Sequence, residues 1–293
     1  MQATPLVRPN MAATIRKITS ISTLPHVTLE ILKLGNNSSS GAKDMEKIIQ
    51  TDAALTSKLM KMVNSAHFSL REPVLNIRKA IVFLGFKVVK DIALAASVCD
   101  LFSNDVPIGS YRRTDLWRHS VCVAIAAKLI AQKTKLNIQD QVFSTGILHD
   151  LGIIMIDQYL HSHFIKIMEK HETTQNLGEA EKEILGFTHT QLGAEVATTW
   201  KLPEEFLTVI ENHHSPIKAK EKYRKFVSIM HIADVIINGQ KVGFVAERLI
   251  DAQQFNFALT QLNFRKKDIG IIVAELPHEF EKAKDLIELV EDK

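Results

Sequence analysis

The chain has 293 residues, of which 46% are hydrophobic and 24% are charged, a composition typical of a globular protein. Its formal net charge of +3 gives no support for a nucleic-acid-binding protein on charge alone. Cys99 and Cys122 lie in apolar segments, and no signal peptide or apolar run of about 18 residues is present. We therefore expect a cytoplasmic protein with reduced cysteines, no membrane span and no thiolate-rich metal site.

Apolar residues recur every three or four positions along most of the chain, a spacing typical of amphipathic helices. Alternating apolar and polar residues, which would indicate strands, are scarce, so we predict an all-α fold built as a multi-helix bundle. The expected helices span residues 10–19, 26–35, 41–51, 53–67, 75–84, 86–103, 112–134, 140–158, 160–172, 177–186, 189–200, 203–214, 220–238, 245–259, 265–275 and 278–291.

Local signals indicate where some of these helices begin and end. Asp52 precedes an apolar helical run, so we expect it to be an N-cap. Gly239 follows another such run and is expected to end that helix. The segment SNDVPIGS at 103–110 is rich in turn-forming residues and predicts a loop. Residues from about 241 onward carry no site-like side chain apart from His278 and are expected to close the bundle.

Side chains that can bind a metal ion occur inside several apolar segments. The clearest case is FSTGILHDLGIIMIDQY at 143–159, where His149 and Asp150 interrupt an apolar run. Burying an ionised carboxylate is costly unless a partner compensates its charge. The full set consists of His119, His149, Asp150, His189, His213, His214 and Asp234. Imidazole and carboxylate groups suit Fe, Mn, Zn, Ni and Co, so a shared metal site would explain why so many polar groups are buried.

Each of these residues also has a plainer interpretation, because a buried histidine is more often a hydrogen-bonded core residue than a ligand. Considered one at a time, His119, His189 and Asp234 would take that interpretation. Adjacent residues on a helix point about 100° apart, which lets Asp150 bridge two ions if the helix ends or packs obliquely there. The remaining histidines are expected to lie outside the site: His26, His67, His161, His163, His171, His231 and His278.

Several segments resemble one known family. They are ISTLPHVTLEILKL at 21–34, MEKIIQTDAALTSKLMKMVNSAHFSL at 45–70, NIRKAIVFLGFKVVKDIAL at 76–94, LWRHSVCVA at 116–124, GILHDLGIIMID at 146–157, HTQLGAEVATTWKLPEEFLTVIENHHSP at 189–216 and HIADVI at 231–236. The order His, His-Asp, His, His-His, Asp resembles the HD superfamily of metal-dependent phosphohydrolases. The most specific marker of its HDOD branch is the VNSA segment at 63–66, which is followed by AI at 80–81 and LG at 84–85.

The resemblance to the HDOD family implies an N-terminal helical subdomain packed on an HD-like helical core. It covers roughly residues 14–240, with 14–110 as the N-terminal part and 111–240 as the metal-binding part. Residues 241–293 would then form a C-terminal helical extension.

The same resemblance implies an assignment of the metal ligands. A first metal would take His119, His149, Asp150 and Asp234, and a second would take His189, His213 and His214, with Asp150 as the bridge. The expected cofactor is one or two divalent ions, with Fe or Mn ahead of Zn or Ni.

Two departures from the pattern of active relatives bear on catalysis. The HD-GYP phosphodiesterases, a related branch, carry a lysine where this chain has Ile153, and the GYP stretch after the double histidine is absent. We therefore expect an HDOD-type signalling or regulatory protein that keeps its metal site and binds a protein partner or a phosphorylated small molecule. The alternative is a metal-dependent phosphohydrolase acting on a nucleotide or cyclic dinucleotide, with Asp150 as a catalytic residue.

Overall fold

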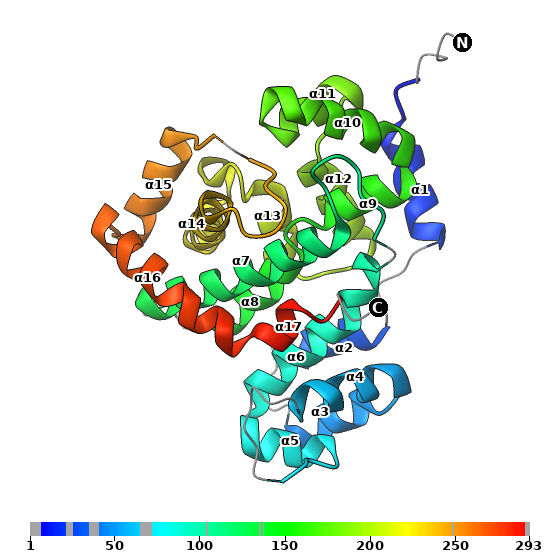
Figure 1. Ribbon diagram of the computed structural model, residues 1–293, viewed down its shortest axis with the longest axis vertical. Helices are drawn as coiled ribbons and strands as arrows, with labels where there is room; N and C mark the ends of the chain where they lie inside the picture. The colour runs from blue at the N-terminus through cyan, green and yellow to red at the C-terminus, as the bar shows by residue number, and fades with distance from the viewer. Residues whose placement is uncertain are drawn as a thin grey trace.

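The computed structural model describes residues 7–21, 26–34, 41–64, 72–103, 105–134, 136, 138–247 and 249–290. These residues contain no strand, only isolated bridges between Ile108 and Tyr111 and between Asn176 and Glu247. The predicted all-α fold is thus confirmed (Figure 1). No helix in this part of the chain is both long enough and apolar enough to cross a membrane.

The helices follow one another along the chain with short connections. In order they are α1 (Met11–Ile21), α2 (His26–Leu34), α3 (Ala42–Ile49), α4 (Ala53–Val63), α5 (Ile77–Leu84), α6 (Phe86–Val98), η2 (Cys99–Phe102), α7 (Arg113–Thr134), α8 (Gln139–Leu148), α9 (Leu151–Tyr159), α10 (His161–Thr174), α11 (Leu177–Ile184), α12 (His189–Thr199), α13 (Glu204–Asn212), η3 (Pro216–Lys218), η4 (Glu221–Tyr223), α14 (Arg224–Gln240), α15 (Ala252–Leu262), α16 (Lys266–Lys282) and α17 (Lys284–Ile287).

Helices α2 to α6 form a lobe at one end of the molecule, the lower end in Figure 1. Within it, α2, α4 and α5 all pack against α6, whose apolar residues are buried along most of its length. The other side of α6 packs against α8, so this helix joins the lobe to the rest of the molecule. The preceding α1 does not belong to the lobe, because it packs against α9 and α12.

The larger part of the molecule is organised around α7, which is buried along most of its length. Helices α8 and α14 pack against it, and α12 packs against both α9 and α13. Cys99 and Cys122 are both buried in the apolar core. The two helices that pack on α7 bring candidate ligands with them, because His149 follows α8 and Asp234 lies on α14.

The C-terminal helices return to α7 after a short segment, residues 241–247, which we call the strap. In the strap, the Phe244 N–H donates to the Asp115 carbonyl at 3.0 Å, while the Ala246 carbonyl accepts from the Leu177 N–H at 3.1 Å. A Cβ at Gly243 would lie 2.3 Å from the Asp115 carbonyl oxygen, so the strap can cross α7 this closely only with glycine there. Beyond it, α15 packs against α14, and both α16 and α17 pack against α7.

The predicted helix ends can be compared with those observed. Asp52 is the N-cap of α4, where its side chain accepts from the Leu55 N–H at 2.9 Å, as expected. The prediction that Gly239 ends a helix is wrong, because α14 continues to Gln240. Lys241 ends it instead, with a left-handed φ of 55° and an N–H that reaches the carbonyls at the end of the helix. Position 239 faces open space, so nothing there requires a break.

Two other expectations were also wrong. The strap occupies the start of the helix expected at 245–259, and α15 begins only at Ala252, after Asp251 caps it. Separate helices were expected at 265–275 and 278–291, yet α16 runs without interruption through the gap between them, including Pro277. The loop predicted at 103–110 is confirmed, because no helix lies between η2 and α7 in the described residues.

Candidate metal centre

The His149–Asp150 pair lies where one expected helix is divided into two. The sequence predicted a continuous helix over 140–158, but α8 ends at Leu148 and α9 begins at Leu151. Asp150 has φ −97° and ψ 21°, outside the helical range, and this change of direction turns its side chain into the core. A Cβ at Gly152 would lie only 1.9 Å from the His189 carbonyl oxygen, so glycine lets α9 approach the start of α12. The break and this glycine together bring Asp150 beside His189.

A first group of side chains meets one oxygen of Asp150. The Nε2 atoms of His119 and His149 lie 3.7 Å and 3.2 Å from Asp150 Oδ2. Asp234 reaches the same place from α14, with its Oδ1 at 3.0 Å from His119 Nε2 and 3.9 Å from His149 Nε2. Four of the predicted residues, from three separate helical regions, therefore converge.

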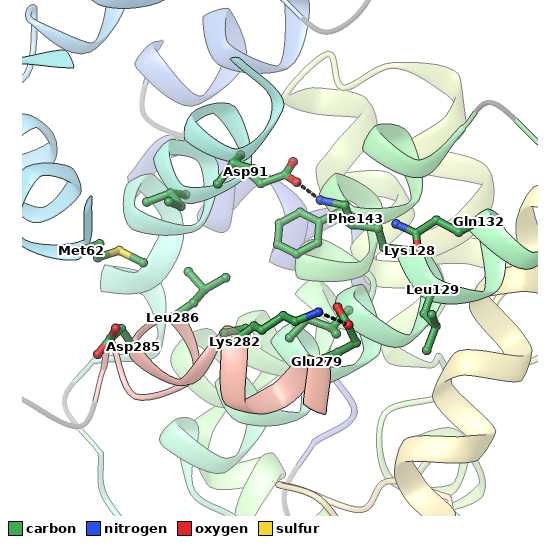
Figure 2. Close-up of a pocket in the computed structure, with 14 residues that line it drawn as sticks. Met62, Asp91, Lys128, Leu129, Gln132, Phe143, Glu279, Lys282, Asp285 and Leu286 are labelled. Carbon is green, nitrogen blue, oxygen red and sulfur yellow. Dashed lines mark hydrogen bonds and ion pairs between the residues drawn. The ribbon is translucent and has the colours of Figure 1, made fainter. Parts of the chain in front are cut away.

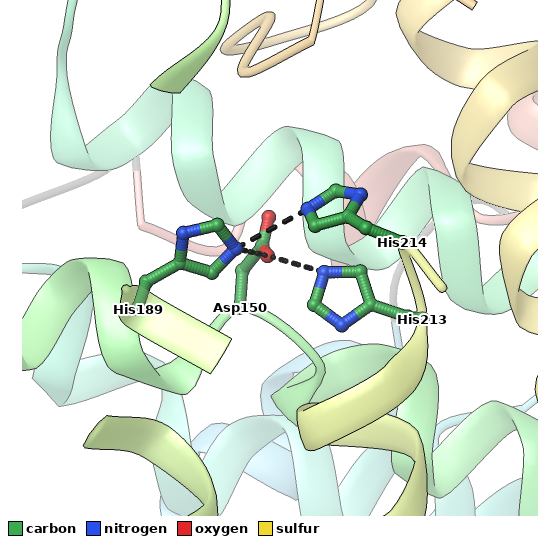
Figure 3. Close-up of side chains that lie close together, drawn as sticks. All are labelled: Asp150, His189, His213 and His214. Carbon is green, nitrogen blue, oxygen red and sulfur yellow. Dashed lines mark hydrogen bonds and ion pairs between the residues drawn. The ribbon is translucent and has the colours of Figure 1, made fainter. Parts of the chain in front are cut away.

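A second group meets the other oxygen of Asp150 (Figure 3). The Nε2 atoms of His213 and His189 lie 3.3 Å and 3.8 Å from Asp150 Oδ1. His214 completes the group, with its Nε2 at 3.2 Å from His189 Nε2 and its Nδ1 at 3.5 Å from Asp234 Oδ2. All seven residues singled out in the sequence thus lie in one cluster, with Asp150 between its two halves.

The buried polar atoms of this cluster fit a bound cation better than they fit one another. Among the described residues, His149 Nε2, His213 Nε2 and Asp150 Oδ1 have no hydrogen-bond partner. His149 Nδ1–H donates to the Gly146 carbonyl at 2.8 Å, and His213 Nδ1–H donates to the Ile210 carbonyl at 3.1 Å. These bonds leave a lone pair on each Nε2, directed at a carboxylate that can itself only accept. The two Nε2 atoms and the Asp150 oxygen all offer electron pairs, and a cation placed between them would accept these pairs.

Burial and neighbouring charges shift the pKa values of the cluster residues in different directions. Burial lowers the pKa of His213 and holds that of His214 well below its ordinary value, which favours neutral imidazoles. Burial would raise the pKa of Asp150, but His149 and His213 outweigh it and hold that pKa well below its ordinary value. Burial also opposes protonation of His149, but the Asp150 carboxylate outweighs it and raises the pKa of His149. The cluster thus combines an ionised carboxylate with neutral imidazoles at His213 and His214, and deprotonated groups of this kind bind divalent cations.

Glu181 belongs to the cluster's surroundings and was missed in the sequence. Its Oε2 accepts from His189 Nδ1–H at 2.8 Å and from the His189 backbone N–H at 2.7 Å, and the residue is fully buried on α11. The carboxylate thereby orients the His189 ring and, against the effect of burial, raises the pKa of His189 to about 9. The available signal was its position one turn after Leu177, on the apolar face of a predicted helix.

The cluster opens into a cavity of about 520 Å³, lined by His189, His214 and Asp234 among mostly polar residues. Lys182 and Lys218 lie in its wall, which also contains several acidic side chains. Glu247, at the end of the strap, lines the same cavity, so the expectation that the tail carries no site-like residue besides His278 is wrong. Burial raises the pKa of Glu247 to about 8.

The histidines expected outside the site divide into three kinds. His26, His161 and His278 are exposed, and His163 is half-buried. His171 and His231 are buried. His171 Nε2 bonds to the Ala246 carbonyl at 3.0 Å, whereas His231 lines the cavity, contrary to expectation, and its Nδ1–H donates to the His213 carbonyl at 2.7 Å. His67 lies outside the described residues.

Ile153, at the position where HD-GYP enzymes carry lysine, is fully buried on α9. It lies in the apolar core, so it presents no charge to the cavity. Any positive charge that the cavity presents to a ligand must therefore come from residues other than Ile153.

The chain was compared with known families and proteins. The sequence model of the HDOD domain matches residues 21–216. A protein of Treponema pallidum described as uncharacterized is 26% identical over 231 residues, which are 78% of this chain but only 44% of that protein. The chain therefore spans less than half the length of this relative.

Two solved structures extend the likeness to three dimensions. The HDOD domain protein of unknown function from Geobacter sulfurreducens is 25% identical, with a TM-score of 0.79 over 94% of this chain and 97% of its own. A Shewanella amazonensis protein, provisionally named a phosphohydrolase, is 22% identical, with a TM-score of 0.72 over 96% of this chain and all of its own, and shares the fold. Because the HDOD match covers well over half of a chain whose helices follow the same arrangement, this protein belongs to the HDOD domain family.

Proposed function

We propose that this HDOD protein binds two divalent cations in the histidine–aspartate cluster and hydrolyses a phosphoester in the adjoining cavity. The observation that carries the proposal is the position of Asp150, whose Oδ2 faces His119 and His149 while its Oδ1 faces His189 and His213. A carboxylate in this position bridges two cations in many hydrolytic sites. Bound there, the cations supply Lewis acidity toward a phosphate oxygen and an activated water.

The chain's own residues have three tasks in this proposal. The imidazoles and the two carboxylates fix the positions of the cations, while Glu181 orients His189 from behind. His214 is the most accessible member, with 24% of its side chain exposed, so the cluster is open on the side of the cavity. Lys182 and Lys218 in the cavity wall are placed to contact a phosphorylated ligand.

The donor set favours particular ions. It offers only imidazole nitrogens and carboxylate oxygens, because both cysteines are buried elsewhere, Cys122 with its pKa raised by burial to about 12. Such a set suits Fe or Mn first, with Zn or Ni as alternatives.

A second role is favoured by a specific observation. Because Ile153 is buried and apolar, the site lacks the lysine that assists phosphoryl transfer in HD-GYP enzymes. In this role the protein binds the same ions and a phosphorylated ligand without turnover, and passes the signal to a protein partner.

The test combines metal analysis with turnover. We expect purified protein supplied with Mn²⁺ or Fe²⁺ to hold close to two ions per chain by elemental analysis and to hydrolyse bis(p-nitrophenyl) phosphate. Asp150→Asn keeps the shape of the side chain and removes its charge, and it should lose both properties. His278→Gln, an exposed histidine on α16, is the matched control and should keep both. Bound metal without turnover would favour the regulatory role, whereas protein that binds no metal would refute both.

A further inference from the structure

A second cavity lies on the other side of α7, where three parts of the molecule meet. Its wall takes Met62 and Ile92 from the α2–α6 lobe, Leu129 and Phe143 from α7 and α8, and Leu286 from the C-terminal helices. Its volume is about 240 Å³ (Figure 2). None of the seven cluster residues lines it, so it is distinct from the candidate metal centre.

The size and lining of this cavity suit the apolar part of a small molecule. An engineered apolar protein cavity of about 150 Å³ binds benzene, so by proportion a volume of 240 Å³ takes about ten carbon atoms. Ligand pockets typically combine such an apolar wall with a few convergent polar groups.

The polar groups of this cavity include two ammonium groups. Lys128 Nζ lies 2.7 Å from Asp91 Oδ2 and 5.2 Å from the centre of the Phe143 ring. Lys282 Nζ bonds to Glu279 Oε1 at 2.6 Å. Figure 2 shows the two pairs on opposite sides of the same space, with Phe143 and Leu286 beside it. A lysine ammonium carries three donors, so each has donors left after its single carboxylate bond.

We propose that this cavity binds a small organic carboxylate with an apolar, ring-sized body. A carboxylate accepts charge-assisted hydrogen bonds from both lysines while the body fills the space between Phe143 and Leu286. The third carboxylate of the wall, Asp285, lies beyond Leu286 and apart from both ammonium groups (Figure 2). A phosphate dianion fits less well than a single carboxylate, because Asp91 and Glu279 offset the lysine charges. This proposal does not depend on the function proposed for the metal cluster.

The binding test uses 2-naphthylacetate, whose ring system matches the cavity volume, and 2-naphthylacetamide as its uncharged counterpart. Titration calorimetry on the full chain should show one site for the acid, with a dissociation constant below about 1 mM. The amide should bind about tenfold more weakly, because it cannot form ion pairs with the lysines. Equal binding of acid and amide, or no binding of either at 1 mM, would refute the proposal.

Four variants locate the site. Lys282→Met, at a position with 49% of the side chain exposed, and Lys128→Met should each weaken the acid about tenfold and leave the amide unchanged. Ala283→Phe fills the cavity from its half-buried edge and should abolish binding of both compounds. It keeps the test decisive if Lys128→Met unfolds through loss of the ion pair with Asp91. Lys133→Met, on α7 but outside the cavity wall, is the matched control. If it lost binding as the others do, or if all four bound as the parent does, the cavity would not be the site.

Discussion

The molecule's two cavities differ in how they accommodate charge. The larger one, beside the histidine–aspartate cluster, is walled mainly by polar side chains and contains buried atoms with no hydrogen-bond partner among the described residues. The smaller one is mostly apolar, and its two lysines are paired with Asp91 and Glu279. The comparison teaches that buried acceptors without a hydrogen-bond partner favour binding of a cation, whereas lysine–carboxylate pairs at the edge of an apolar space suit an organic ligand.

Asp150→Ala is the variant expected to have the largest effect, and it tests whether the two cavities bind their ligands independently. The variant removes the group shared by both halves of the cluster, so we expect metal affinity to fall by more than about 100-fold, beyond the range for a residue that only supports a ligand. The increase in melting temperature that added Mn²⁺ gives the parent protein should disappear, because metal binding stabilises only the folded state. Elemental analysis and thermal melts measure both effects. Naphthylacetate binding should be retained, and its loss would show that the two cavities are not independent.

Gly152→Ala should have the next largest effect. Its Cβ would lie 1.9 Å from the His189 carbonyl oxygen, a backbone atom that cannot move without shifting α12. We expect the free energy of unfolding to fall by about 3 kcal/mol, measured by urea denaturation. A change below about 1 kcal/mol would contradict the close packing of α9 against α12.

Glu181→Gln should weaken the metal centre without dismantling it. The amide keeps the size of the side chain but loses the charge that orients and polarises His189. The expected loss of metal affinity is about 10- to 100-fold, the usual range for a carboxylate behind a ligating histidine. Calorimetric titration with Mn²⁺ measures it, and Glu183→Gln, an exposed position on the same helix outside the cavity wall, is the control. Equal affinities of the two variants would remove Glu181 from the site.

The smallest effect is expected at Gly239, within α14. A Cβ there meets no atom within 4 Å, so Gly239→Ala should stabilise the protein by about 0.5–1 kcal/mol through helix propensity. Urea denaturation beside Gly152→Ala gives a direct contrast between a glycine required by packing and one that is not. Destabilisation would mean that α14 does not continue through this position.

Much of the metal cluster could be predicted from the sequence because histidines and aspartates are conspicuous in apolar helices. Asp150 and Asp234 could be identified as candidate ligands in this way. Their closeness in space could not be predicted, because it depends on how helices far apart in the chain pack together. Glu181 was missed because a glutamate in an amphipathic helix is ordinarily exposed. The smaller cavity could not be predicted either, because Phe143 and Leu286, which line it, have the sequence spacing of ordinary core residues.

Helix ends were predicted well where a side chain makes the end and poorly where tertiary contacts do. Asp52 caps α4 by its own carboxylate, and this could be recognised from the residues that follow it. The break at His149–Asp150 has no proline or glycine cap, and it exists because Asp150 must turn toward groups from other helices. The strap replaced the start of an expected helix because its backbone bonds to Asp115 and Leu177, which are distant in sequence.

The strap has a practical consequence for dissecting this protein. The HDOD match ends at residue 216, whereas Asp234 and the strap residue Glu247 both follow it and both line the larger cavity. A fragment trimmed to the matched range would lack one carboxylate of the cluster and one side of its cavity. The smallest piece suitable for assay must therefore extend past the crossing of Gly243 over α7, and a negative result from a shorter fragment would say nothing about the intact chain.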